Sequence, residues 1–155
     1  MSKPRFFKPH NPLAKMVQKT GGKEVAKAIE DAAANLESIR DSTVAAVDAD
    51  IAAVEKLLGG DGRPAQGDLQ KAYRQCNAIA GIAGSCGLNA VGQAAFSLCE
   101  LLDRLVTSGG WNIEAVTVHL NGMRLLRGGV GDAAEQTVLD GLRKVTVAAS
   151  QDKGR

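Results

Sequence analysis

Apolar residues recur at alternating steps of three and four along most of this chain, and this spacing most constrains its fold. A period near 3.6 residues places such side chains on one face of an α-helix. Two stripes of this kind come first, and each predicts an amphipathic helix: Val25, Ala28, Ile29, Ala32, Leu36 and Ile39, then Val44, Val47, Ile51, Val54 and Leu58. The segment from Gly59 to Pro64 breaks the pattern and predicts a loop.

Four more helices are predicted after this loop. Asp68 is a candidate N-cap for the third helix, which ends at Gly87. The fourth stops at Gly109, the fifth covers about 112–127 and the sixth about 132–149. The buried side of the third helix is expected to consist of Leu69, Ala72, Tyr73, Cys76, Ile79, Ala80 and Ala83. Because most connections are short, we expect an all-α antiparallel bundle of four helices, with additional N- and C-terminal helices.

The chain is predicted to form one domain preceded by a basic arm. Residues 1–21 form the arm, 22–150 the helical bundle and 151–155 a tail. Residues 1–27 hold seven Lys or Arg against one acid, Glu24, whereas the rest of the chain is mildly acidic. Aromatic residues are only 3% of the chain, and its many Ala, Leu and Val residues favour helix over sheet. No run of 18 apolar residues occurs, so no membrane association is expected.

Residues that usually hold metals or cofactors are scarce. Cys76, Cys86 and Cys99 have no C-x-x-C spacing, and the only histidines are His10 and His119. The sequence therefore predicts neither a metal site nor a cofactor, and its thiols fit a reducing cytoplasm. Nucleic acid is not expected as a partner, because the arm lacks regularly interleaved aromatic residues.

The segment RQCNAIAGIAGSCG, residues 74–87, carries three glycines at the end of one predicted helix. Each glycine inside a helix costs about 1 kcal/mol relative to alanine, so bare backbone must serve a purpose there. That purpose is either close packing of two helices or the approach of a partner. One face of this helix collects residues at steps of four, three, four and three: Gln70, Arg74, Asn77, Gly81 and Gly84.

This segment resembles the histidine-containing phosphotransfer (HPt) domains. In that family a helix reads roughly H-x-L-K-G, with a second glycine six residues after the first; here NAIAG ends at Gly81, and Gly87 follows. The resemblance covers residues 68–106 closely, is compatible with the helix order from 23 to 127, and extends to chemotaxis-associated HPt-like proteins. It implies a helical bundle in a two-component or phosphorelay pathway. Its partner would be a response-regulator receiver domain or a histidine kinase.

Two positions depart from the family pattern. Asn77 stands where the family has its phosphate-accepting histidine, and Ala80 where it usually has a lysine. An amide nitrogen has a delocalised lone pair and cannot accept a phosphoryl group as an imidazole does. We therefore expect a module that docks through the face around Asn77 without carrying phosphate, and we do not expect an enzyme.

Three alternatives stay open. Asn77 could orient water in a response-regulator phosphatase, although such motifs place an acid one helical turn earlier, where this chain has Arg74. His119 could carry phosphate if its imidazole is reachable, although a histidine on an apolar helix face is more often an interior group. The chain could also be a helical adaptor outside two-component signalling, with the basic arm as its contact. The sequence leaves open whether the protein is a monomer or a dimer.

Overall fold

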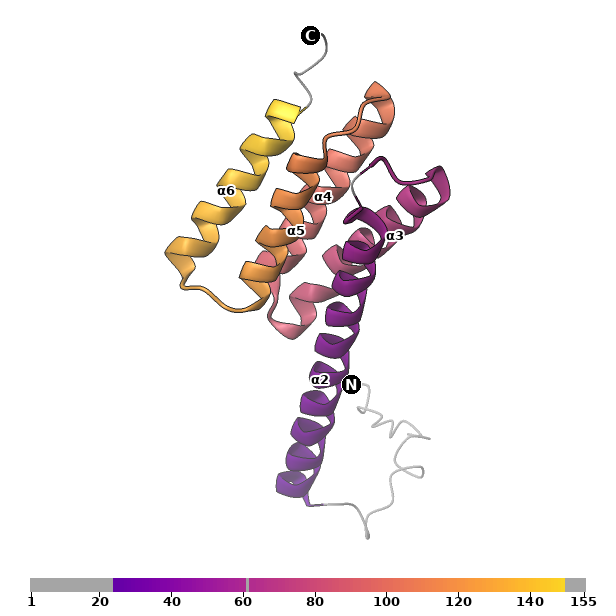
Figure 1. Cartoon of the computed structure of the whole chain (residues 1–155). Helices are drawn as coiled ribbons and strands as arrows, with labels where there is room; N and C mark the ends of the chain where they lie inside the picture. Colours follow the sequence, from indigo (N-terminus) through magenta and orange to yellow (C-terminus); the bar gives the residue numbers. More distant parts are fainter. Residues whose placement is uncertain (1–23, 61, 150–155) are drawn as a thin grey trace, which may run out of the picture. The chain divides into compact units, whose positions relative to one another are not determined.

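The computed structural model describes residues 24–60 and 62–149, and within these ranges the chain is all-α (Figure 1). The predicted fold class is thereby confirmed. The described elements are α2 (Val25–Leu58), α3 (Gln66–Ile82), the 3-10 helix η1 (Ala83–Cys86), α4 (Asn89–Ser108), α5 (Ile113–Arg127) and α6 (Asp132–Ala149). Helices α5 and α6 agree with their predicted ranges. The predicted arm, 1–21, and tail, 151–155, lie outside the described residues.

The chain divides into two compact units within α2, one ending at Glu37 and one beginning at Ser38. In the first unit the described residues form the N-terminal part of α2, where Val25, Ile29 and Leu36 are exposed. The second unit contains the hydrophobic core and the candidate docking surface.

The first two apolar stripes of the sequence, 25–39 and 44–58, belong to a single helix. The prediction of two separate helices is therefore wrong. Helix α2 has 34 residues and continues through Arg40–Thr43, a segment with neither glycine nor proline to interrupt it. The hydroxyl groups of Ser42 and Thr43 both donate to the carbonyl oxygen of Ile39, each at 2.8 Å. These polar side chains are therefore satisfied inside the helix instead of starting a turn.

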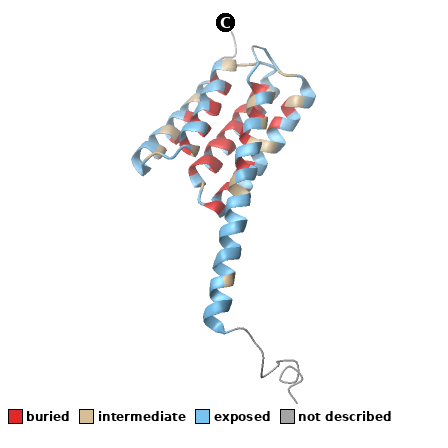
Figure 2. Cartoon of the chain, turned by 60° about the horizontal axis from the view of Figure 1, so that its bottom comes forward, coloured by how far each residue is buried: buried red, intermediate tan, exposed pale blue. Residues whose placement is uncertain are grey.

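The core lies among α3, α4, α5, α6 and the second half of α2 (Figure 2). Helix α4 is its centre, since it packs against α3, α5 and α6. Helix α2 contributes four buried side chains: Val47, Ile51, Val54 and Leu58. Burial of each such aliphatic side chain stabilises the fold by about 1.5–3 kcal/mol.

Helices α3 and α4 run antiparallel, as predicted from the short connection between them. The early residue Gly92 of α4 lies against Ala80, near the end of α3. The later residue Cys99 directs its thiol at the carbonyl oxygen of Tyr73, 3.8 Å away. The reversal occurs at Gly87, whose φ of 84° is in the left-handed region that favours glycine.

The beginning of α3 differs from the prediction in two ways. The helix starts at Gln66 after Ala65, so Asp68 lies in the first turn and is not the N-cap. Its carboxylate forms an exposed ion pair with Lys71 at 3.1 Å, and an acid in the first turn also interacts favourably with the helix dipole. Tyr73, which was expected on the buried side, is 43% exposed.

Candidate docking surface

The structure exposes all five residues of the predicted docking face, here called the α3 face: Gln70, Arg74, Asn77, Gly81 and Gly84. The first four lie on α3 and the last in η1. The opposite side of α3 buries Leu69, Ala72, Cys76 and Ile79 in the core, and this burial fixes the rotation of the helix about its axis. The 3.6-residue period then directs the α3 face toward solvent.

The two glycines of the α3 face differ in how closely another helix approaches them. A Cβ atom placed on Gly81 would meet no other atom of the described residues within 4 Å. A Cβ on Gly84 would come within 3.1 Å of the side-chain oxygen of Asn89 alone. The interpretation in which these glycines let two helices approach closely is therefore not supported for Gly81, whereas Gly84 lies close to a side chain of α4.

Close helix packing depends on two other glycines, to which the sequence motifs assigned no such role. A Cβ on Gly92 of α4 would lie 3.4 Å from the Cβ of Ala83 and 3.5 Å from the carbonyl oxygen of Ala80. A Cβ on Gly122 of α5 would lie 3.1 Å from both methyl groups of Leu142 on α6. Both glycines are buried, and their position on the apolar side of a predicted helix was the only signal in the sequence.

Asn77 and Arg74 supply the polar groups of the α3 face. The side-chain amide of Asn77 has no hydrogen-bond partner among the described residues, and it offers both donors and an acceptor. Arg74 donates from Nε to the carbonyl oxygen of Gln70 at 3.3 Å, within the same helix. This bond restrains the guanidinium group one helical turn before Asn77.

Two shallow grooves border the α3 face. The first has a volume of about 310 Å³ and lies between α3 and α4, lined by Gln66, Leu69, Gln70, Tyr73, Arg74, Leu102, Asp103 and Val106. The second, of about 610 Å³, extends from the end of α3 across α4 to α6, lined by Ala80, Gly84, Asn89, Gly92, Gln93, Phe96, Ser97, Glu100 and Arg143. Exposed aromatic side chains lie in both, Tyr73 in the first and Phe96 in the second. Aromatic side chains beside polar ones are enriched where proteins bind each other.

His119 lies in the core of the bundle, where its side chain is completely buried. Its Nδ1 donates to the carbonyl oxygen of Ala115 at 2.8 Å. Its Nε2 lies 3.1 Å from the hydroxyl oxygen of Ser97 and 3.0 Å from that of Thr146. Burial lowers the pKa of His119 below its ordinary value, so the ring is neutral at physiological pH. Phosphotransfer through His119 would need an imidazole that a partner can reach, and the imidazole of His119 is buried.

The three cysteines are free and buried. Cys76 on α3 forms a hydrogen bond with Cys99 on α4, a pairing that no local sequence pattern indicates. This bond, together with burial, raises the pKa of Cys76 well above its usual value. The thiol of Cys76 therefore stays protonated directly behind the α3 face.

The described part of the chain contains neither a metal site nor a membrane span. No three side chains of His, Cys, Asp or Glu in this part of the chain are grouped so that they could hold a metal ion. No helix in the described ranges is both long enough and apolar enough to cross a bilayer.

Comparisons of the chain with protein-family models, with curated proteins and with solved structures found no match.

Proposed function

We propose that this protein is an HPt-like docking module of two-component signalling. It binds a response-regulator receiver domain or a histidine kinase through the α3 face and does not carry phosphate at residue 77. The observation that best supports this proposal is the exposed Asn77 one turn before Gly81, whose backbone no side chain of the described residues covers. The proposal also depends on the resemblance of residues 68–106 to the HPt family.

The chemistry of the α3 face fits docking better than phosphate transfer. The amide of Asn77 is not a nucleophile, and Ala80 provides no cation to neutralise a phosphoryl group. The face still offers bare backbone, the Asn77 amide and the Arg74 guanidinium. The positive charge of this guanidinium suits an acidic partner surface. A cytoplasmic protein that occupies a receiver domain in this way competes with true phosphotransfer proteins and so lowers the flux of phosphate.

Binding of purified receiver domains and kinases, measured by titration calorimetry, tests this proposal. Gly81→Leu should weaken the complex at least about tenfold, because the new side chain occupies the space where the partner approaches. Gly141→Leu is the matched control, since Gly141 is an exposed helical glycine of α6 and a Cβ atom placed on it would also meet nothing within 4 Å. Equal binding by both variants would contradict the α3 face as the contact.

A phosphorylation assay separates docking from phosphate transfer. Incubation with radiolabelled kinases should produce a complex without label on this chain. Stoichiometric label on the chain would overturn the proposal. Complexes that contain neither receivers nor kinases in a pull-down would instead favour the adaptor alternative.

A response-regulator phosphatase is the second candidate, favoured by the exposed amide of Asn77 without a partner in the described chain. Such an amide could orient a water molecule against a phospho-aspartate. The lifetime of a phosphorylated receiver, measured with wild type and with Asn77→Ala, tests this activity. A wild-type protein that shortens the lifetime and a variant that does not would establish it, and unchanged lifetimes with both proteins would exclude it.

A further inference from the structure

The first half of α2 carries an apolar face that is exposed to solvent. Val25, Ile29, Leu36 and Ile39 are 76%, 65%, 67% and 61% exposed. With Ala32, these residues follow one another at steps of four, three, four and three. This is the spacing of the a and d positions of a heptad repeat, in which one helix packs lengthwise against another.

This part of α2 needs a partner to be stable. The helix contributes no buried residue before Val47, and from Val25 to Ile39 every side chain except the half-buried Asp31 is exposed. Helices of this length are marginal in water when their apolar face remains hydrated. A continuous row of large apolar side chains on a surface usually marks a protein interface.

The residues beside the apolar row indicate which partner fits. The positions that flank it, equivalent to e and g, are mostly small and uncharged: Ala26, Ala28, Ala33, Asn35 and Ser42, with Arg40 the exception. Acidic residues such as Glu30 lie on the other side of the helix, away from the row. Two copies of this face can therefore meet without bringing like acidic charges together.

The same arrangement argues against the basic arm, residues 1–21, as the partner. A basic segment lying on the apolar row would find alanines beside it, whereas the acids that could attract it point away. Charge complementarity between the arm and the apolar row is thus weak. A second copy needs no such complementarity, because the residues that flank its own row are mostly uncharged as well.

We propose that the first half of α2 is a homodimerisation surface, on which residues Val25–Ile39 pack against the same residues of a second copy of the chain. Each dimer then carries two α3 faces. This inference does not depend on the proposed function, because a dimer can form whether or not the α3 face binds a receiver domain.

Sedimentation equilibrium of the full chain tests the proposal. Wild type should be a dimer at concentrations of about 10–100 µM, the range expected for a small apolar interface. The double variant Ile29→Glu/Leu36→Glu buries two like charges in each helix of the interface and should raise the dissociation constant at least about 100-fold. Ala34→Glu places the same charge on the opposite side of the helix and should leave the dimer intact.

Circular dichroism shows whether each variant keeps the bundle folded. A folded double variant that is monomeric, next to a dimeric Ala34→Glu, supports the proposal. A monomeric wild type at about 100 µM would overturn it. So would an Ala34→Glu variant whose dissociation constant rises as much as that of the double variant. Hydrogen exchange adds a separate readout: protection of residues 25–39 in a monomer that disappears on deletion of residues 1–21 would assign the face to the arm and reject the dimer.

Discussion

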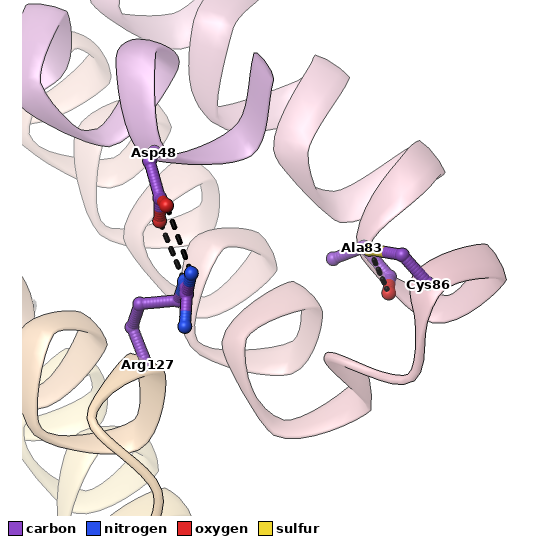
Figure 3. A network of polar contacts seen from close by, with 4 residues as sticks. All are labelled: Asp48, Ala83, Cys86 and Arg127. Atoms are coloured by element: carbon purple, nitrogen blue, oxygen red, sulfur yellow. Dashed lines mark hydrogen bonds and ion pairs between the residues drawn. The ribbon is translucent and has the colours of Figure 1, made fainter. Parts of the chain in front are cut away.

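Arg127 at the end of α5 and Asp48 on α2 form an ion pair with two parallel hydrogen bonds, although they are 79 residues apart in the sequence (Figure 3). The Nη2 group of Arg127 donates to Oδ2 of Asp48 at 2.8 Å, and Nε donates to Oδ1. Two turns further along α2, Glu55 pairs with Arg124. These two pairs connect α2 to α5 at the edge of the apolar core.

Loss of the Asp48–Arg127 pair should destabilise the fold only slightly. The Asp48 side chain is 47% exposed, and partly exposed pairs contribute about 0.2–1 kcal/mol. We expect Asp48→Asn to lower the free energy of unfolding in urea by that amount at low salt and by less in about 1 M NaCl. Asp103→Asn, which removes an exposed acid of α4, should have no comparable salt-dependent effect; an equal effect would show that net charge and not the pair is responsible.

His119 should make the stability of the protein depend on pH. Burial holds its pKa in the folded state below 6.5, the ordinary value expected when the chain is unfolded. Below pH 6.5 the unfolded chain therefore binds a proton that the folded protein does not, so stability decreases as the pH falls toward the folded-state pKa. The decrease is at most about 1.4 kcal/mol per pH unit.

Urea unfolding at several pH values between about 7.5 and 5.5 measures this effect. This pH range lies above the one in which ordinary carboxylates titrate. His119→Gln retains hydrogen-bonding capacity but cannot titrate, so its stability should change much less over the same range. A variant as pH-sensitive as wild type would show that another group is the source.

Glycine substitutions should have opposite effects at Gly81 and Gly122. Gly81→Ala adds a methyl group in open space and should stabilise the protein by about 0.5–1 kcal/mol through helix propensity. Gly122→Leu forces a large side chain against Leu142 and should destabilise it by about 1–3 kcal/mol. Thermal unfolding of both variants measures the difference. A destabilising Gly81→Ala would mean that the bare backbone serves the fold after all.

Introducing the two residues that the HPt pattern has at positions 77 and 80 should give the α3 face phosphate chemistry. In Asn77→His/Ala80→Lys the new imidazole occupies an exposed position, and the lysine lies one helical turn further along the same helix. We expect this variant to take a phosphoryl group from a phosphorylated receiver domain, detected as acid-labile label on the chain. Asn77→Ala/Ala80→Lys, which has no imidazole, should stay unlabelled. Binding of the receiver without any transfer would show that its orientation differs from that in the HPt family.

Much of the fold could be predicted because its signals are local. The 3.6-residue period located the last helices, and Asn112 caps α5 by accepting a hydrogen bond from the backbone of Ala115 at 2.9 Å. The prediction failed where local signals were weak. The segment Arg40–Thr43 was treated as a boundary although it contains no helix breaker, and Asp68 resembles an N-cap but lies inside the first turn.

The exposure of the candidate site also followed from the sequence, because residues spaced three and four apart share one face of a helix and the opposite stripe was strongly apolar. Periodicity alone could not distinguish Tyr73, which lies between the two faces and is partly exposed.

The sequence by itself thus determined that the chain is helical, where its last helices lie and which way most of their faces point, since these features depend on residues within a few turns of each other. Only the tertiary structure decided which glycines allow helices to touch, that Cys76 meets Cys99, and that His119 bonds to Ser97 and Thr146 in the core. Each of these contacts joins residues from different helices. Their meeting depends on how the helices pack together, which a pattern that repeats every few residues does not specify.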